Sequence, residues 1–274
     1  MKFAYYIKKD GLSEDPRVDA MLKQLREGGV EVYRVEAAEE ICPGTSGLLS
    51  LGGDGTFLLG AKMAVQADIP MLGVNFGRLG FLSEMRPEEL PQAIFGRELR
   101  IEERSLLQVM AGGSLEEGFW PYALNETSIS REGASMLGID VEIDGSPLPT
   151  YWADGLLVAT SSGSTAYSLS VGGPICTPDS KVFIVAPISP HNLNVRPLVV
   201  PQTAKIAISL RSREGKAMFS MDNRYRRISA DARILVSQAP VRLKRMSTGK
   251  STFINALRTR LLWGEDVRNG NEAR

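Results

Sequence analysis

The first hundred residues alternate short apolar runs with segments of helical periodicity. Strand patterns lie at 2–7, 30–35, 47–51 and 71–75. Helical patterns lie between these runs or after the last of them, at 57–66 and 87–95. Strands separated by helices of this length predict a parallel sheet that is covered on both faces.

The clearest helix signal follows Asp15-Pro16, a pair typical of a helix N-cap with proline in the first turn. The apolar positions after it keep the i, i+3, i+4, i+7 spacing of one helix face: Val18, Met21, Leu22 and Leu25. Gly28-Gly29 predicts the end of this helix.

From residue 101 onward the pattern changes to short strands separated by turn signals. Asp144-Gly145 predicts a hairpin turn, and a second turn is expected at 211–215 between strands at 204–210 and 217–221. Two more strands are expected at 234–236 and 241–243. Helical spacing returns near the C-terminus, at Phe253, Ile254, Leu257, Leu261 and Leu262.

The chain is therefore expected to combine two fold types, α/β and β. We predict a doubly wound α/β domain at 1–100, a mainly antiparallel β domain at 101–250, and a closing helix with its tail at 251–274.

Composition and charge exclude several classes of protein. Lys plus Arg and Asp plus Glu both number 32, which argues against a globally basic nucleic-acid binder. Hydrophobic residues make up 43% of the chain, which excludes disorder as a description of the whole. The strongest apolar run, 182–188, is far shorter than a membrane span, and the opening residues lack a signal-peptide layout. We expect a soluble, cytoplasmic protein without membrane or nucleic-acid partners.

The strongest candidate for chemistry is the turn that follows the strand at 47–51, which reads Gly52-Gly53-Asp54-Gly55-Thr56. Glycines let the backbone approach a ligand closely, and the helix N-terminus after them favours phosphate. A carboxylate in such an anion cradle suits one of three tasks: holding a metal, orienting a hydroxyl, or accepting its proton. The alternative is an ordinary turn in which Asp54 caps the helix.

This turn resembles that of a phosphotransferase superfamily that includes NAD kinases, diacylglycerol and sphingosine kinases, and 6-phosphofructokinases. Four later blocks are similar to NAD kinases in particular: 75–82, 124–126, 154–175 and 190–197. The chain also ends in an aromatic helix with a Leu-x-Trp close, as that family does. The resemblance covers nearly the whole chain.

The resemblance implies a kinase that moves the γ-phosphoryl group of ATP to the 2′-hydroxyl of the adenosine ribose of NAD. It also implies that the second domain is β-sandwich-like and binds NAD, and that the closing helix packs back on the first. Mg²⁺ or another divalent metal would assist, and a homodimer or homotetramer is expected because a neighbouring subunit contributes to the dinucleotide site. Lipid or sugar-phosphate kinases that share the Asp54 turn, and a non-catalytic NAD-binding sensor, remain alternatives.

The same resemblance implies roles for individual residues. Asp54 would be catalytic or would help to hold Mg²⁺, and Glu126 would accept hydrogen bonds from ribose hydroxyls. The full set of substrate-binding residues that it implies is Gly52, Gly53, Asp54, Gly55, Thr56, Phe81, Asn125, Glu126, Asp154, Ser162, Thr165, Ala166, Tyr167, Ser168, Leu169 and Ser170.

The sequence departs from the family pattern at Thr160-Ser161-Ser162, at Trp152 and at Asp222-Asn223-Arg224. Relatives often carry Asp-Gly-Gln where this chain has Asp222-Asn223-Arg224. We therefore give Asp222 less weight. The role of Arg224 stays open: its guanidinium could pair with a phosphate, but the run 224–227 is more typical of a solvated surface.

Overall fold

The computed structural model describes residues 1–8, 10–111, 119–249 and 252–263, which fold into two compact units. The first unit comprises residues 1–102 together with the chain from Arg245 onward, and the second comprises residues 103–244. The sequence predicted boundaries at 100 and 250, whereas the chain returns to the first unit inside its last strand, at Arg245.

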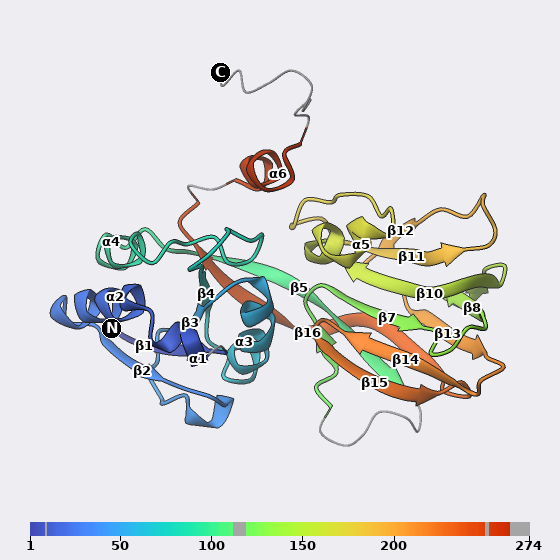
Figure 1. Ribbon diagram of the computed structural model, residues 1–274, viewed down its shortest axis with the longest axis horizontal. Coiled ribbons are helices and arrows are strands. Elements are labelled where there is room, and N and C mark those ends of the chain that lie inside the picture. The colour runs from blue at the N-terminus through green and yellow to red at the C-terminus, as the bar shows by residue number, and fades with distance from the viewer. Residues whose placement is uncertain (9, 112–118, 250–251, 264–274) are drawn as a thin grey trace. The chain divides into compact units, whose positions relative to one another are not determined.

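The first unit alternates strands and helices. Its elements are β1 (Lys2–Ile7), α1 (Asp10–Ser13), α2 (Pro16–Glu27), β2 (Glu31–Arg34), η1 (Ala38–Glu40), β3 (Gly47–Leu51), α3 (Asp54–Gln66), β4 (Met71–Val74), α4 (Leu90–Phe95), the start of β5 (Arg100–Ala111), the end of β16 (Ile234–Ser247) and α6 (Phe253–Leu261). Strands β1 to β4 form a parallel sheet in the order β4-β3-β1-β2 (Figure 1). The parallel sheet and its strands are those that the sequence predicted.

The connections of this sheet run in opposite directions from its middle. Helix α2 leads from β1 outward to β2, and helix α3 leads from β3 outward to β4. Because such crossovers are right-handed, the two helices cover opposite faces, which makes the sheet doubly wound. The strand order reverses between β1 and β3, and ligands of open α/β sheets bind beyond the carboxyl ends of the strands at this point.

Helix α2 forms as its sequence predicts. The Asp15 side chain accepts a hydrogen bond from the backbone N–H of Arg17 at 2.9 Å, and Gly28 is the C-cap. All four apolar positions of the predicted face are buried in the core of this unit, where they pack with residues of β1, β3 and β4.

The second unit is built almost entirely of strands. Its elements are β5 and β16 with β6 (Tyr122–Ala123), β7 (Glu126–Ser130), β8 (Leu137–Ile143), β9 (Ser146–Pro147), β10 (Tyr151–Thr160), η2 (Ser162–Thr165), α5 (Tyr167–Ser170), β11 (Val182–Pro190), β12 (Leu198–Pro201), β13 (Ile206–Arg211), β14 (Lys216–Met221) and β15 (Arg224–Ser229). The strands follow the order β15-β14-β7-β10-β8-β13-β16, and β11 pairs with the other edge of β10. The pairings between these strands are antiparallel.

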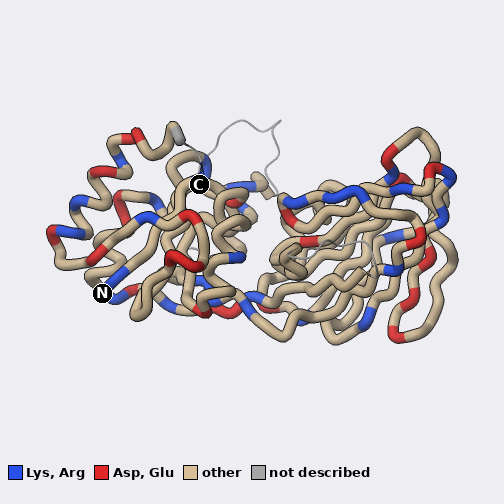
Figure 2. Tube along the Cα trace, turned by 90° about the horizontal axis from the view of Figure 1, so that it is seen from below, with Lys and Arg blue, Asp and Glu red and all other residues tan. Residues whose placement is uncertain are grey.

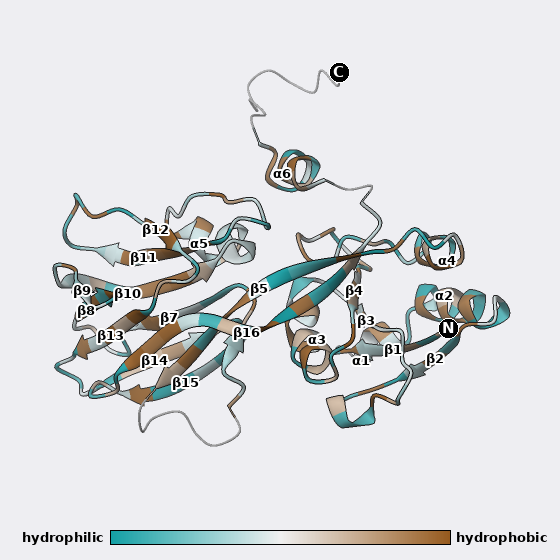
Figure 3. Cartoon of the chain, turned by 180° about the vertical axis from the view of Figure 1, so that it is seen from behind, coloured by the Kyte–Doolittle hydropathy of each residue, from teal (hydrophilic) through white to brown (hydrophobic). Residues whose placement is uncertain are grey.

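The larger apolar core of this unit is shared by many strands. It collects inward-facing side chains from strands as distant in sheet order as β14, β11 and β16, among them Phe219, Phe183 and Ile234. Alternating apolar and polar positions along these strands are visible in Figure 3. The strands therefore wrap around a shared interior, as expected of a β-sandwich-like unit.

One predicted turn and one predicted pair of strands in the second unit need correction. The turn at 211–215 is not a hairpin, because β13 pairs with β8 and β16 whereas β14 pairs with β7 and β15. The strands expected at 234–236 and 241–243 are one long strand, β16. The hairpin at Asp144-Gly145 is confirmed, with both residues at positive φ. A further two-residue hairpin turn at Asp222-Asn223 was missed.

Charges of both signs are interspersed along each unit (Figure 2). Among the helices that the structure describes, none has the length and apolar character needed to cross a membrane.

Candidate active site

The Gly-rich turn lies between β3 and α3, at the point where the strand order reverses. Gly52 has φ +146°, which L side chains rarely adopt, and a Cβ there would lie 2.5 Å from the Thr56 hydroxyl oxygen. Gly53 is the N-cap, so Asp54 is the first residue of α3. The turn thus places free N–H groups of a helix N-terminus beyond the carboxyl end of β3.

A cavity of about 340 Å³ opens at this turn. Its lining residues are Leu12, Arg17, Leu51, Gly52, Gly53, Thr56, Asn75, Phe76, Gly77 and Arg78. Two arginines, two glycines of the turn and a helix N-terminus around one cavity are the donors that a polyphosphate needs. The sequence pointed to the glycines, but it gave no sign that Arg17 and Arg78 would join them.

Asp54 does not cap its own helix; its carboxylate reaches a distant loop instead. Oδ2 accepts the backbone N–H of Phe81 at 2.8 Å. Oδ1 accepts the N–H groups of Leu82 at 3.1 Å and Ser83 at 2.8 Å. The helix-cap interpretation of Asp54 is therefore wrong, and the carboxylate is held in one orientation by three amides.

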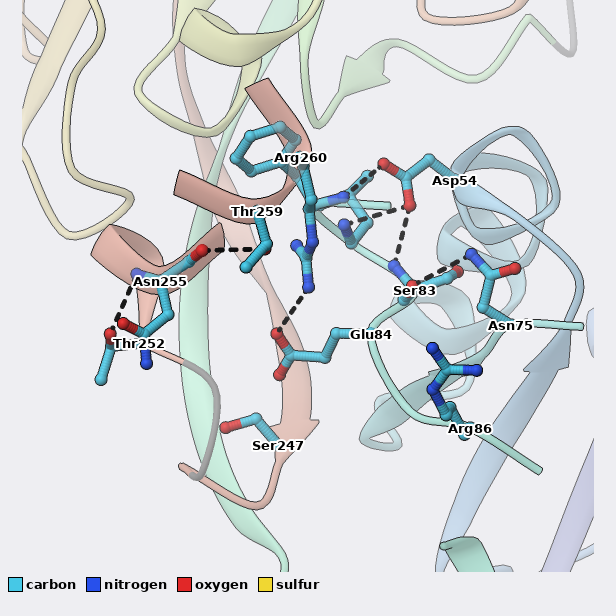
Figure 4. A network of polar contacts seen from close by, with 12 residues as sticks. Asp54, Asn75, Ser83, Glu84, Arg86, Ser247, Thr252, Asn255, Thr259 and Arg260 are labelled. Carbon is cyan, nitrogen blue, oxygen red and sulfur yellow. Dashed lines mark hydrogen bonds and ion pairs between the residues drawn. The ribbon is translucent and has the colours of Figure 1, made fainter. Parts of the chain in front are cut away.

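The loop that holds Asp54 is itself fixed by Asn75, directly after β4. The Asn75 side chain donates to the carbonyls of Arg78 (2.8 Å) and Ser83 (3.2 Å), and its Oδ1 accepts the N–H of Gly77 (2.8 Å). Figure 4 shows Asp54, Ser83 and Asn75 joined in this network. The first unit therefore provides a carboxylate in a defined position, on the residue that follows the cavity-lining Gly53.

In the second unit, Asn125 and Glu126 lie where β7 begins. The Asp222 carboxylate accepts the backbone N–H groups of Leu124 (3.0 Å), Asn125 (2.8 Å) and Glu126 (3.3 Å). The left-handed turn at Asp222, with φ +50°, aims the carboxylate at this segment. The low weight given to Asp222 from the sequence was wrong: it positions both residues.

Glu126 is a buried acid next to another acid. Burial raises its pKa to about 8, the nearby Asp222 charge acts in the same direction, and a hydrogen bond from the Tyr167 backbone opposes them. Its Oε2 is buried without a hydrogen-bond partner. An unpartnered, buried carboxyl oxygen is what a hydroxyl-bearing ligand would satisfy.

The raised pKa of Glu126 predicts a pH-dependent stability. Between pH 4.5 and 8 the folded chain keeps a proton on Glu126 that the unfolded chain loses, so stability falls as pH rises. The slope for this one group is at most about 1.4 kcal/mol per pH unit. We expect the urea midpoint of Glu126→Gln to vary less between pH 5 and 8 than that of the wild type.

A control for this measurement is Glu142→Gln, in the same unit, because the Glu142 side chain is 47% exposed and pairs with Arg233 at the surface. Parallel pH profiles for wild type and both variants would contradict the assignment of a titrating, buried Glu126.

Residues 160–170 pack against the Asn125-Glu126 segment. The Thr160 N–H donates to the Asn125 carbonyl at 2.8 Å, and a Cβ at Gly163 would overlap the Asn125 main chain. The structure thus brings the first part of the expected stretch to Asn125, and the Tyr167 backbone forms a hydrogen bond to Glu126. Tyr167 and Ser170 are exposed, Ser162, Thr165, Ala166 and Leu169 are half-buried, and Ser168 is fully buried, with its hydroxyl against Gly173.

Asp154 does not join this group. It lies in β10 five residues before Ala159, the partner of Glu126 in the β-ladder, which separates the two acids by roughly 16 Å along the strand. Its carboxylate pairs with Arg131 at 2.6 Å.

Arg224 also departs from expectation. It is half-buried, donates to the carbonyls of Trp120 (2.6 Å) and Tyr122 (2.5 Å), and lies over the rings of Phe119 and Trp120. Burial lowers its pKa, and the neighbouring Asp222 acts in the opposite direction. The solvated-surface interpretation holds for 225–227, which are exposed, and is wrong for Arg224.

Comparison with known proteins identifies the family. The family described as ATP-NAD kinase N-terminal domain matches residues 12–96, and ATP-NAD kinase C-terminal domain matches residues 124–247. NAD kinase from Flavobacterium psychrophilum is 39% identical over 227 residues, and that from Bacteroides fragilis is 41% identical over 225 residues. Each match covers 81% of this chain and 77% of the relative.

The chain belongs to the NAD kinase family. One solved structure agrees with this assignment, and a second agrees with the fold. NAD kinase from Archaeoglobus fulgidus, in complex with ATP, has a TM-score of 0.72 and 27% identity over 96% of this chain and 98% of its own. Yeast NADH kinase complexed with NADH has a TM-score of 0.84 over 97% of this chain and 89% of its own, and at 22% identity it supports the fold alone.

These matches confirm the family, the fold class and the enzyme class that the sequence predicted. For the divalent metal expected with ATP, the described part of the chain holds no group of three or more His, Cys, Asp or Glu side chains placed to bind an ion. This donor set fits Mg²⁺ brought by a nucleotide, because such an ion is bound through one or two carboxylates and the substrate phosphates.

Proposed function

We propose that this NAD kinase transfers the γ-phosphoryl group of ATP to the 2′-hydroxyl of the adenosine ribose of NAD, giving NADP. The observation that carries the proposal is the Asp54 carboxylate, which three loop amides fix in one orientation. Asp54 directly follows Gly53, a residue that lines the cavity of about 340 Å³. Phosphoryl transfer asks a protein chiefly for positioning and for charge stabilisation, and this site offers both.

Asp54 meets the acceptor hydroxyl in this proposal. Each carboxylate oxygen has two lone pairs, and the hydrogen bonds to Phe81, Leu82 and Ser83 leave one of them on Oδ2. The hydroxyl donates to this position, and its proton passes to Asp54 as the bond to phosphorus forms. The three amides keep the carboxylate still while this happens.

The triphosphate of ATP lies in the cavity at the turn, against Gly52, Gly53, Gly55 and Thr56. Arg17 and Arg78 supply positive charge. A divalent metal such as Mg²⁺ would neutralise part of the phosphate charge. Asp54 is the carboxylate of this turn that could hold it, as the alternative to its role toward the acceptor hydroxyl.

Three sets of residues are assigned to recognition of the dinucleotide in this proposal. Glu126 accepts hydrogen bonds from ribose hydroxyls through its free Oε2, and Asn125 reads adenine through its amide. Phe81 packs on a flat ring of the ligand. Residues 162–170 lie along adenine and ribose. The exposed side chains of Tyr167 and Ser170 make the main contacts, and the wall of the site is formed by Ser162, Thr165, Ala166, Ser168 and Leu169.

Asp154 lies too far from Glu126 along β10 to bind the same ribose, so in this proposal it contacts the nicotinamide side of the dinucleotide. We expect the enzyme to be a homodimer or homotetramer. We place this oligomer in the cytoplasm.

A substrate panel tests the function. The purified chain is incubated with ATP, Mg²⁺ and one acceptor at a time: NAD, a diacylglycerol or a sugar phosphate. We expect product from NAD, detected as NADP by an NADP-specific dehydrogenase. Binding of NAD in calorimetry without NADP formation would instead favour a sensor, and phosphorylated lipid or sugar would favour the other kinases.

Replacing Arg78 with alanine is expected to raise the KM for ATP about tenfold, the loss of one charge-assisted phosphate contact, and to leave the KM for NAD nearly unchanged. Arg26→Ala removes an exposed arginine from the last turn of α2 in the same unit and serves as the control. Equal KM values for ATP in the two variants would remove Arg78 from the triphosphate site.

A further inference from the structure

The C-terminal helix α6 lies against the loop that holds Asp54. Thr252 caps the helix by accepting the N–H of Asn255 at 3.2 Å, and Ala256 and Leu257 are buried. The ring of Phe253 meets the ring of Phe81 with centroids 6.2 Å apart, at an interplanar angle of 52°. One aromatic contact thus joins the helix to the start of the loop.

Arg260, two turns further along α6, makes a second contact with the same ring. Its guanidinium carbon lies 5.3 Å from the Phe81 centroid, within the range of a cation–π interaction. Its Nη2 lies 3.8 Å from Oε2 of Glu84, the residue that follows the three amide donors to Asp54. Arg260 therefore contacts both ends of the segment 81–84. Its ion pair with Glu84 is drawn in Figure 4.

Burying the Arg260 guanidinium at this position costs desolvation free energy. Its side chain is only 10% exposed, and its Nε and Nη1 atoms are buried without a hydrogen-bond partner. Burial lowers the pKa of the guanidinium, with Glu84 and Asp54 opposing this and Arg245 adding to it. Replacement of such a buried charge by a packed apolar residue often stabilises a protein, so attachment of the helix alone does not explain an arginine here.

The residues around the Arg260 guanidinium show which part of the loop its charge holds. Glu84 lies between two arginines, with Arg245 at 2.8 Å on Oε1 and Arg260 on Oε2. Beside them is a cavity of about 420 Å³, lined by residues of the loop, α4 and α6. Because close apolar packing is interrupted by this cavity, polar and ring contacts must fix the loop.

We propose that Arg260 is a positioning residue for phosphoryl transfer: by holding Phe81 and Glu84, it fixes the backbone amides that orient the Asp54 carboxylate. This inference rests on the proposed function and deepens it. The path is continuous, from the guanidinium to Phe81 and Glu84, from these to the N–H groups of residues 81–83, and from those to Asp54. Arg260 itself touches neither the proposed phosphate cavity nor the acceptor.

The consequence is an effect on turnover that exceeds the effect on binding. A misplacement of about 1 Å in a reacting group can cost on the order of 100-fold in rate. Loss of Arg260 loosens the loop and with it Asp54, whereas the Gly52–Thr56 turn and its cavity keep their own contacts. The KM for ATP is therefore expected to stay close to the wild-type value.

The test compares Arg260→Met and Arg260→Lys with Arg258→Met and Arg258→Lys, because Arg258 is exposed on the same helix. Measured quantities are kcat, both KM values and the thermal midpoint. Arg260→Met is expected to lower kcat by at least about 30-fold and to change the KM for ATP by less than about threefold. Arg260→Lys keeps a cation for Glu84 but loses the planar group over Phe81, so a kcat about three- to tenfold below that of Arg258→Lys is expected.

Three results would overturn the proposal. The first is a kcat for Arg260→Met within twofold of Arg258→Met. The second is a fall in thermal midpoint that accounts for the lost activity, with Arg260→Lys no better than Arg260→Met. The third result applies if Arg260→Met does not fold: equal kcat values for Arg260→Lys and Arg258→Lys would then overturn the proposal. A wild-type chain that makes no NADP would contradict the proposed function itself. The three results above are all measured against an active wild type, so they contradict the role of Arg260 alone.

Discussion

Replacing Asp54 with asparagine is expected to lower kcat by about 1000-fold, within the range of a lost general base. Asparagine has nearly the same shape, but one of its two oxygens becomes an NH₂ group that cannot accept a proton. The structure adds a second penalty. An asparagine whose oxygen accepts from Leu82 and Ser83 turns its NH₂ toward the N–H of Phe81, so two donors face each other.

The chain should nevertheless fold, with a loss of about 1–3 kcal/mol for the buried donor left without an acceptor. Asp68→Asn is the matched control, because Asp68 is exposed just beyond the other end of α3 and its φ of +51° suits asparagine. Turnover of NAD by Asp54→Asn at the rate of Asp68→Asn would remove Asp54 from the chemistry.

Replacing Gly80 with alanine is expected to lower kcat by about 100-fold without changing any group that takes part in the reaction. A Cβ on Gly80 would overlap the Asp54 carboxylate, which lies directly against this glycine. Because both carboxylate oxygens are bonded to the amides that follow Gly80, the carboxylate cannot move aside and keep its hydrogen bonds. We expect the displaced Asp54 to remain charged but to miss the acceptor hydroxyl.

Gly11→Ala serves as the comparison for this variant, since a Cβ at Gly11 in α1 would meet no atom within 4 Å. Steady-state kinetics with NAD and ATP, together with thermal midpoints, separate a displaced carboxylate from a general loss of folding. A kcat for Gly80→Ala close to that of Gly11→Ala would show that the position of Asp54 does not limit turnover.

Local structure in the first unit was largely predictable because its signals are local. Asp15 and Pro16 mark the start of α2, the four apolar positions after them set its buried face, and glycine ends it. The run at 47–51 became β3 with the predicted bounds, and the glycines after it form the turn at the reversal of strand order. These features depend on residues within a few positions of each other.

Pairings between distant segments were not predictable in the same way. The strands on either side of 211–215 look like a hairpin, yet each finds partners elsewhere in the sheet. The real hairpin at Asp222-Asn223 lacks the glycine that usually marks such a turn. A single sequence contains no information on which of several apolar strands will become neighbours.

In the candidate site, too, local motifs were predictable from the sequence and long-range contacts were not. Asp54, Asn125 and Glu126 stand in recognisable motifs, so their residue types and spacing pointed to them. The hydrogen-bond partners that hold these residues do not stand in recognisable motifs. The amide donors to Asp54 lie 27 to 29 residues away in the sequence, and Asp222 lies 96 to 98 residues from the amides that it accepts. Arg224 and Arg260 became visible as buried cations once the fold placed carbonyls and aromatic rings around them.

The most direct measurement of the central claim is a crystal structure of the chain with NAD bound. The account predicts that the 2′-oxygen of the adenosine ribose lies within hydrogen-bond distance of an Asp54 carboxylate oxygen, about 2.6–3.2 Å. An adenosine ribose bound away from the Gly52–Thr56 turn, with Asp54 still bonded to its loop and no hydroxyl near it, would contradict the account.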